Sequence, residues 1–179
     1  MKRFALTAIG ADTPGIVAGI TSVLFEYGCN IEDSSMTRLE EEFSVILIMT
    51  TADDIKTAEL EKEIKEMERG MGLEIHFKEI GEKPLRKERA STHMVTVSGY
   101  DRPGIVYKTA DLLAGCGINI TDLTTRMLHG HGRSIYIMLM EVSLPKTLDG
   151  AAVAASLKTL GDGMGVKIEM KPIETHEAL

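Results

Sequence analysis

The sequence has few aromatic residues and almost no cysteine. Of its 179 residues only 4% are aromatic, none is Trp, and two are cysteines, Cys29 and Cys116. A disulfide framework is therefore excluded as the basis of the fold. The two cysteines fall in no metal-ligand spacing, so we expect reduced, buried or half-buried thiols and no metal site. Eleven Met residues, together with Ile, Val and Leu, must fill the core in place of aromatic rings.

Long apolar runs and an excess of basic residues are also missing. No apolar stretch approaches the roughly 20 residues needed to cross a bilayer, and no signal peptide or lipidation motif opens the chain. The net charge is −7, with 27 acidic residues against 20 basic ones. Because an acidic surface repels phosphate backbones, direct nucleic-acid binding is disfavoured. We expect a soluble, cytoplasmic protein that contacts neither membranes nor nucleic acid directly.

The sequence does contain a long internal repeat. Asp12-Thr13-Pro14-Gly15-Ile16-Val17 returns as Asp101-Arg102-Pro103-Gly104-Ile105-Val106, and Gly28-Cys29-Asn30-Ile31 returns as Gly117-Ile118-Asn119-Ile120, both 89 positions later. This period is too long for a solenoid unit, which has ~20–50 residues, and indicates a duplicated domain. The predicted boundaries are 1–80 for the first domain, 81–91 for a polar linker and 92–175 for the second domain.

Each copy shows the same order of periodic segments. The expected strands are 4–9, 30–39, 43–51 and 73–77 in the first copy and 94–98, 118–128, 134–142 and 166–170 in the second. The expected helices are 14–27 and 55–71 in the first copy and 105–116 and 147–160 in the second. The order βαββαβ predicts an α+β, ferredoxin-like fold, with both helices on one face of an antiparallel four-stranded sheet.

The turn between the first strand and the first helix of each copy is the candidate site. Pro14 is predicted at the first helical position, with Asp12 or Thr13 as the cap. A helix start presents free backbone amides and the positive end of the helix dipole. Since Gly15 and Gly104 have no Cβ, a carboxylate can approach these amides closely.

Asparagine recurs just after this helix. Asn30 and Asn119 open the next strand of their copies, where we expect them to lie beside the same turn. A carboxamide can accept a hydrogen bond from an ammonium group and donate one to a carboxylate. The turn and the asparagine together would suit a free amino acid. The alternative is that these residues only start and stop a helix, and a duplication would copy such signals too.

Two other motifs have simpler explanations. Glu40-Glu41-Glu42 could dock a partner, but is more simply a solvated hairpin turn. His129-Gly130-His131 could bind a metal ion, but two histidines without a nearby carboxylate or cysteine make a poor site. A Gly-rich hairpin tip is the favoured interpretation of the second motif.

An enzyme and an RNA-binding module are the rival functions. Arg38 and Arg102 are the arginines that could clamp an anion near a helix start, yet neither recurs in the other copy. No Ser–His–Asp or Cys–His arrangement can be discerned from the spacing. RNA-recognition modules of this topology stack bases on exposed aromatics of their central strands, whereas the corresponding strands here carry aliphatic residues and Met.

The motif Asp-x-Pro-Gly-Ile-Val followed by Asn-Ile, within a βαββαβ unit, resembles an ACT domain, a small-molecule sensing module of amino-acid metabolism. The tandem arrangement, with Asn30-Ile31-Glu32-Asp33-Ser34 leading to Glu41-Glu42-Phe43, resembles more narrowly the glycine cleavage system transcriptional repressor family. The resemblance covers essentially the whole chain. It is looser in the second copy, where Leu123 replaces the Ser and Gly132-Arg133 replaces the Glu-Phe.

This resemblance implies a function. Such proteins have no DNA-binding domain, act through a partner activator protein and are thought to respond to an amino acid such as glycine. Pairs of ACT units commonly join their sheets side by side and place ligands at the seam. The ligand-binding residues that the resemblance implies are Asp12, Pro14, Gly15, Ile16, Asn30 and Ile31 with Asp101, Pro103, Gly104, Ile105, Asn119 and Ile120.

We therefore expect a non-catalytic regulatory protein, without cofactor, that senses a small, glycine-like amino acid. It would modulate a transcription activator by protein–protein contact. A homodimer is expected as well, because four-stranded sheets with open edges need a cover or a pairing partner. The alternative is a regulatory subunit of an amino-acid biosynthetic enzyme.

Overall fold

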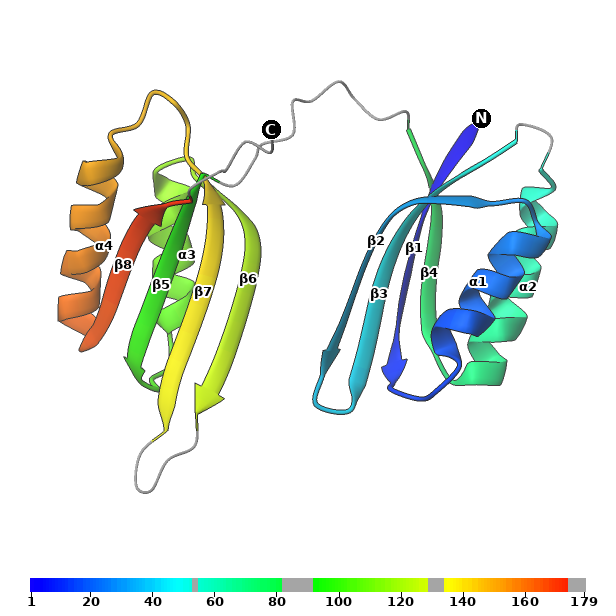
Figure 1. Cartoon of the computed structure of the whole chain (residues 1–179), viewed down its shortest axis with the longest axis horizontal. Coiled ribbons are helices and arrows are strands. Elements are labelled where there is room, and N and C mark those ends of the chain that lie inside the picture. The colour runs from blue at the N-terminus through cyan, green and yellow to red at the C-terminus, as the bar shows by residue number, and fades with distance from the viewer. Residues whose placement is uncertain (53–54, 82–91, 129–133, 174–179) are drawn as a thin grey trace, which may run out of the picture. The chain divides into compact units, whose positions relative to one another are not determined.

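A computed structural model of the chain describes residues 1–52, 55–81, 92–128 and 134–173. The chain divides into two compact units, Met1–Leu85 and Arg86–Leu179 (Figure 1). The first unit comprises β1 (Lys2–Ala11), α1 (Ile16–Glu26), β2 (Asn30–Leu39), β3 (Glu42–Thr51), α2 (Thr57–Met71) and β4 (Glu74–Ile80). The second comprises β5 (His93–Tyr100), α3 (Ile105–Gly115), β6 (Asn119–Leu128), β7 (Ile135–Ser143), α4 (Gly150–Met164) and β8 (Val166–Pro172).

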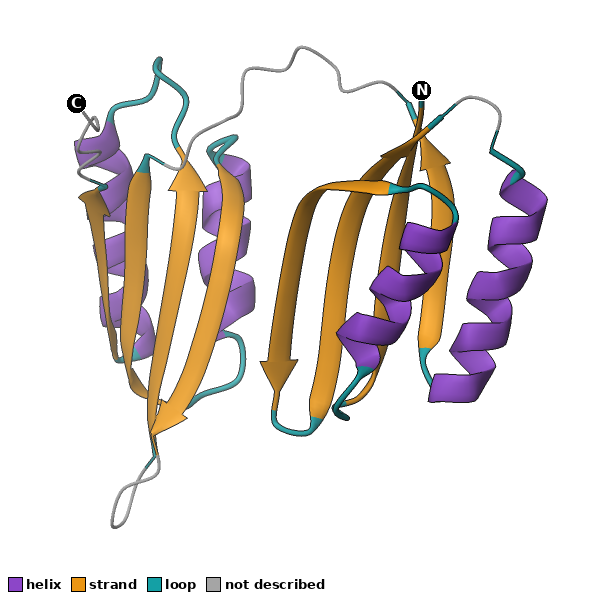
Figure 2. Cartoon of the chain, turned by 45° about the vertical axis from the view of Figure 1, so that its right-hand side comes forward, coloured by secondary structure: helices purple, strands orange, loops and turns teal. Residues whose placement is uncertain are grey.

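Each unit has one four-stranded sheet with two helices packed on one of its faces (Figure 2). The strand order is β2-β3-β1-β4 in the first unit and β6-β7-β5-β8 in the second, and all neighbouring strands are antiparallel. The prediction of two ferredoxin-like α+β units is confirmed. Because β1 and β2 are joined through α1 and both pair with β3, they run parallel to each other.

The core of each unit follows the periodicity of the sequence. On β1, alternate residues Phe4, Leu6 and Ala8 are completely buried, as expected where one sheet face is covered. On α1, Ile16, Ile20 and Leu24 form the buried stripe. Burying such an aliphatic side chain stabilises the fold by roughly 1.5–3 kcal/mol.

Methionine fills much of the second core. Met138 and Met140 on β7 are completely buried, and Met164 at the end of α4 is 7% exposed. In the first unit, Met67 and Met71 of α2 are partly buried against the core. The prediction that these residues act as core filler is confirmed.

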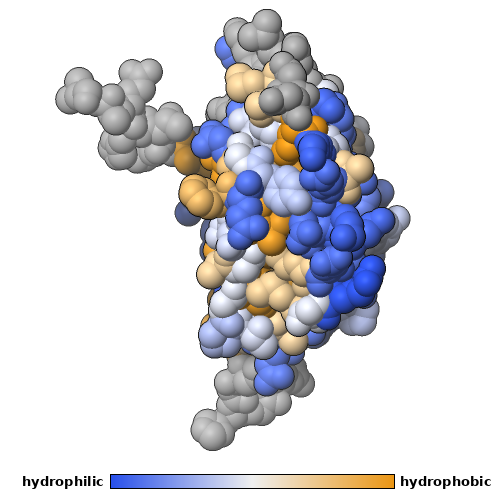
Figure 3. All heavy atoms as spheres, turned by 90° about the vertical axis from the view of Figure 1, so that its right-hand side faces the viewer, coloured by the Kyte–Doolittle hydropathy of each residue, from blue (hydrophilic) through white to orange (hydrophobic). Residues whose placement is uncertain are grey.

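The predicted acidic hairpin turn is also present. β2 ends at Leu39 and β3 begins at Glu42, so Glu40 and Glu41 form the turn, with Glu40 at a φ of 55°. The predicted linker beyond Gly81 and the His129-Gly130-His131 tip lie outside the described residues. On the face of the molecule seen in Figure 3, hydrophilic side chains cover a continuous area on one side.

Candidate functional site

The two candidate turns start their helices differently from the prediction. α1 begins at Ile16 and α3 at Ile105, each directly after a glycine with a positive φ: 99° for Gly15 and 92° for Gly104. The prediction that Pro14 is the first helical residue, capped by Asp12 or Thr13, is wrong. Because Gly15 and Gly104 adopt a left-handed backbone conformation, the chain makes a separate turn there, and the proline lies in this turn before the helix begins.

This geometry leaves the helix starts without a capping side chain. A glycine at the N-cap has no side-chain oxygen to accept from the first helical amides, which therefore remain available to another partner. A Cβ at Gly15 would meet no atom within 4 Å, and one at Gly104 would meet only Cε of Lys108, at 3.9 Å. The helix starts are open to an incoming group.

The predicted binding residues at the turns fall into two groups. Asp12, Pro14, Asp101 and Pro103 are exposed, together with Gly15, while Gly104 is half-buried. The side chains of Ile16 and Ile105 are each 2% exposed and belong to the core. Only the main chain of these two isoleucines is available to a ligand.

Asn30 and Asn119 lie at the opposite end of the sheet from the turns. In the register of the first sheet, Asn30 and Arg3 both pair with Thr50, whereas the turn follows Ala11. At about 3.4 Å per residue, Asn30 is therefore roughly 30 Å from the Asp12 turn. The same applies to Asn119, which pairs with Ser143. The prediction that the asparagine lies beside the turn of its own unit is wrong, because β2 starts where β1 starts.

The residues around the asparagines are accessible. β2 is an edge strand and is exposed along its whole length. Ile31, which follows Asn30, is 37% exposed, and its counterpart Ile120 is half-buried. The asparagines and the turns are thus both on the surface, but no single unit brings them together.

An ion pair occupies the turn of the first unit. Nη1 of Arg38 lies 3.4 Å from Oδ2 of Asp12, and the amide of Asp12 donates a hydrogen bond of 2.7 Å to the carbonyl of Glu41. Arg38 is at the end of β2, on the helix-bearing face, and its side chain is 64% exposed. The Asp12 carboxylate is consequently already paired with a cation.

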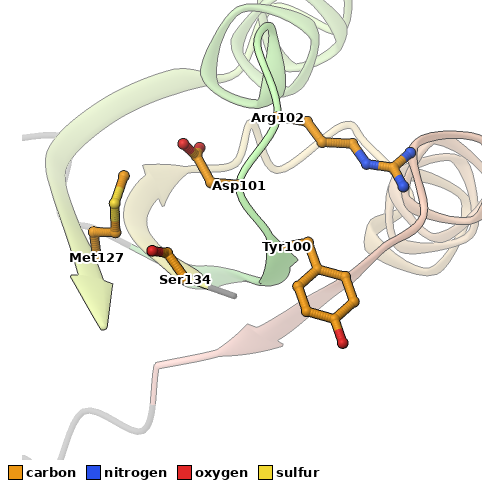
Figure 4. A pocket seen from close by; sticks show the side chains of 5 residues that line it. All are labelled: Tyr100, Asp101, Arg102, Met127 and Ser134. Carbon is orange, nitrogen blue, oxygen red and sulfur yellow. The ribbon is translucent and has the colours of Figure 1, made fainter. Parts of the chain in front are cut away.

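The turn of the second unit borders a cavity instead. Its volume is about 410 Å³, and it is lined by Tyr100, Asp101, Arg102, Met127 and Ser134. In Figure 4, Asp101, Met127 and Ser134 lie on one side of the connection from β5 to α3, and Arg102 extends away from them. Nη1 of Arg102 donates to the carbonyl of Met164, at 3.3 Å, near the negative end of the α4 dipole. The Asp101 carboxylate therefore lines the cavity, whereas the Arg102 guanidinium is bonded to the end of α4.

A tyrosine adds a hydroxyl near this carboxylate. Burial raises the pKa of Tyr136, a hydrogen bond with Thr125 lowers it, and the charge of Asp101 adds a further rise. The Tyr136 hydroxyl lies 4.0 Å from the sulfur of Met138 and is positioned to donate to it. Arg38 as the partner of Asp12, and Met127 and Tyr136 near Asp101, were not predicted from the sequence. A comparison of residues 89 positions apart would have shown that Met127 replaces Arg38.

In the described ranges, no cluster of three or more His, Cys, Asp or Glu side chains could hold a metal ion. No helix in these ranges is both long and apolar enough to cross a bilayer.

The chain is similar to known proteins over most of its length. The ACT domain model matches residues 2–78 and 91–171. The glycine cleavage system transcriptional repressor of Escherichia coli is 30% identical over 158 residues, which cover 87% of this chain and 82% of that protein.

Solved structures show the same architecture. An unknown protein from Galdieria sulphuraria superposes with a TM-score of 0.79 at 25% identity, covering 97% of this chain and 99% of that one. The structure of a candidate glycine cleavage system transcriptional repressor gives a TM-score of 0.72 at 16% identity, with 97% and 98% covered. At that identity, the second likeness shows the fold alone.

Proposed function

The chain belongs to the ACT-domain family, with two units in tandem, and from this premise we propose that it is a non-catalytic regulator that binds a small, glycine-like amino acid. Binding changes its contact with a transcription activator, and so the transcription that the activator drives. Similarity to a transcriptional repressor over 87% of the chain favours this role over that of a regulatory subunit of a biosynthetic enzyme.

The observation that carries the proposal is the open helix start in each unit. Gly15 and Gly104 leave the first amides of α1 and α3 uncapped, and an exposed aspartate precedes each glycine. Helix amides attract a carboxylate, and an aspartate attracts an ammonium group. A free amino acid carries both groups on neighbouring atoms.

The two candidate arginines also fit a non-catalytic role. Arg38 is paired with Asp12, and Arg102 is bonded to the end of α4. Neither is free to clamp a reacting anion near a helix start.

Dimerisation is part of the proposal. A single amino acid is far shorter than the roughly 30 Å that separates the turn from the asparagine within a unit. If the edge strand β2 or β6 of one copy paired in antiparallel fashion with the same strand of a second copy, the asparagine of one copy would approach the turn of the other. We therefore propose a homodimer in which two chains complete each site.

The first test is a thermal melt of the full chain with each of the twenty amino acids. A ligand at about 100 times its dissociation constant stabilises the folded protein by about 2.7 kcal/mol. We expect one or a few small amino acids to raise the melting temperature, and light scattering to give the mass of a dimer. If no amino acid raises the melting temperature and calorimetry shows no heat, the sensor function is refuted.

A second test addresses transcription. A reporter driven by a glycine cleavage promoter should fall in output when the chain is expressed, and this effect should change when the amino acid found in the melts is added. The purified protein alone should not shift the promoter DNA in a gel. A direct shift would favour a nucleic-acid-binding protein instead.

A further inference from the structure

The two turns differ at equivalent positions of the same register. Arg38 pairs across the sheet with Phe43 in the first unit, and Met127 pairs with Tyr136 in the second. Both edge strands have a register shift at the same place, between Ile31 and Asp33 in β2 and between Ile120 and Asp122 in β6. The cation of the first unit has thus been replaced in the second by an uncharged thioether at the same point of the fold.

This replacement changes whether the aspartate of the turn is paired with a cation. In the first unit Asp12 is paired with Arg38, and its amide is bonded to Glu41. In the part of the chain that the structure describes, Asp101 forms no ion pair, and its amide makes no bond to Ser134, the equivalent of Glu41. The turn of the second unit therefore presents a carboxylate that lacks the cation of the first.

The cavity around Asp101 has the character of a cation site with an apolar wall. Its volume of about 410 Å³ leaves room for a small molecule. Ser134 supplies a hydroxyl, and Met127, which is 43% exposed, supplies an apolar surface. Figure 4 shows Asp101, Met127 and Ser134 on the same side of the turn. No basic residue that points into this space is among the labelled side chains.

We propose that the amino-acid site of this protein is the cavity of the second unit, where Asp101 binds the ammonium group of the ligand, and that Arg38 fills the equivalent position of the first unit. This inference rests on the proposed function and specifies it: the first turn binds no free amino acid. A ligand at the first turn would have to compete with the Arg38 guanidinium for the Asp12 carboxylate. At the second turn no described side chain forms an ion pair with Asp101, so the ammonium forms a charge-assisted hydrogen bond there.

The test is isothermal titration calorimetry of the full chain with the amino acid that gives the largest shift in the melts. We expect one site per chain for the wild type. Met127→Arg places a cation where the first unit has one, and Asp101→Asn removes the negative charge. Each should weaken binding by at least about tenfold, the effect of losing one hydrogen bond to a charged group. The N-acetyl derivative of the amino acid, which has no ammonium group, should not bind.

Two matched variants complete the experiment. Leu128→Arg adds the same charge one residue further along β6, on the opposite face of the sheet, at a side chain that is 53% exposed. Arg38→Met removes the cation of the first unit. We expect both to keep the affinity of the wild-type site. Circular dichroism would verify that each variant is folded.

The outcomes separate this inference from the function on which it rests. If Met127→Arg and Asp101→Asn bind as the wild type does, or if Arg38→Met abolishes binding, the assignment to the second unit is wrong while amino-acid sensing stands. If the N-acetyl derivative binds equally well, recognition of the ammonium group is wrong. A wild type that binds no amino acid refutes the proposed function itself.

Discussion

Two glycines on α4, two residues apart, should respond to alanine in opposite ways. A Cβ built at Gly161 would lie 2.7 Å from the carbonyl oxygen of Val166, 2.9 Å from Cγ1 of Ile168 and 3.2 Å from its amide nitrogen. Two of these three contacts are with the backbone of β8, which cannot move without disturbing its pairing with β5. At Gly163, which is exposed, a Cβ would meet nothing within 4 Å.

The magnitudes follow from this difference. Alanine gains up to about 1 kcal/mol over glycine from helix propensity, and this should appear as a stabilisation of about 0.5–1 kcal/mol in Gly163→Ala. In Gly161→Ala the same gain is opposed by overpacking, which costs about 1–3 kcal/mol. Because two of the contacts are with backbone atoms, the cost should lie in the upper part of this range, and we expect Gly161→Ala to lower the free energy of unfolding of the second unit by about 1–2 kcal/mol.

The assay is urea unfolding of the full chain followed by circular dichroism. Two compact units can unfold in two transitions, so each transition is fitted by itself. The transition of the first unit should stay in place in both variants and serves as the internal control. If Gly161→Ala is as stable as the wild type or more stable, the close approach of α4 to β8 is not as described and the reasoning fails.

Two further predictions concern a helix cap and a thiol. Oδ1 of Asp149 accepts a hydrogen bond of 2.9 Å from the amide of Ala151, so Asp149→Ala should destabilise the second unit by about 1 kcal/mol in urea, whereas Asp149→Asn should cost little. Burial raises the pKa of Cys29 above its ordinary value of 9.0, so the folded state favours the protonated thiol. The resulting stabilisation is complete below the unfolded pKa and is lost as the pH rises through the folded one. In alkylation with iodoacetamide, Cys29 should react more slowly in the native protein than in urea at the same pH, and equal rates would contradict the burial.

The secondary structure was largely predictable because the periodicity of the sequence matches the packing. Phe4, Leu6 and Ala8 alternate as a half-covered strand requires, and the structure buries all three. The helix start was not predictable in the same way. Asp-x-Pro is typical of a capped helix start, but Gly15 adopts a left-handed φ that inserts a turn before the helix. Because glycine adopts positive and negative φ about equally readily, the sequence does not specify which of the two occurs here.

The misplacement of Asn30 has a different cause. The order strand, helix, strand makes β1 and β2 parallel, so that β2 begins at the end of the sheet where β1 begins. This consequence of the topology was contained in the predicted βαββαβ order, and the residues themselves gave no wrong indication. The pairing of Asp12 with Arg38, in contrast, depends on the register of two strands that are not neighbours in the sheet, which a single sequence does not specify.

The repeat itself distinguishes structural residues from functional ones. Gly10 and its counterpart Gly99 are kept in both copies because a Cβ would lie 2.9 Å from Leu73 in one unit and 2.8 Å from Val166 in the other. The register shift in the edge strand is kept as well. Residues shared by the copies therefore include many that only maintain the fold. Since both copies need the same fold, selection for a ligand in one of them acts on positions where the copies differ. Arg38 and Met127 occupy such a position: Arg38 lies beside Asp12 in the first copy, and Met127 lies beside Asp101 in the second.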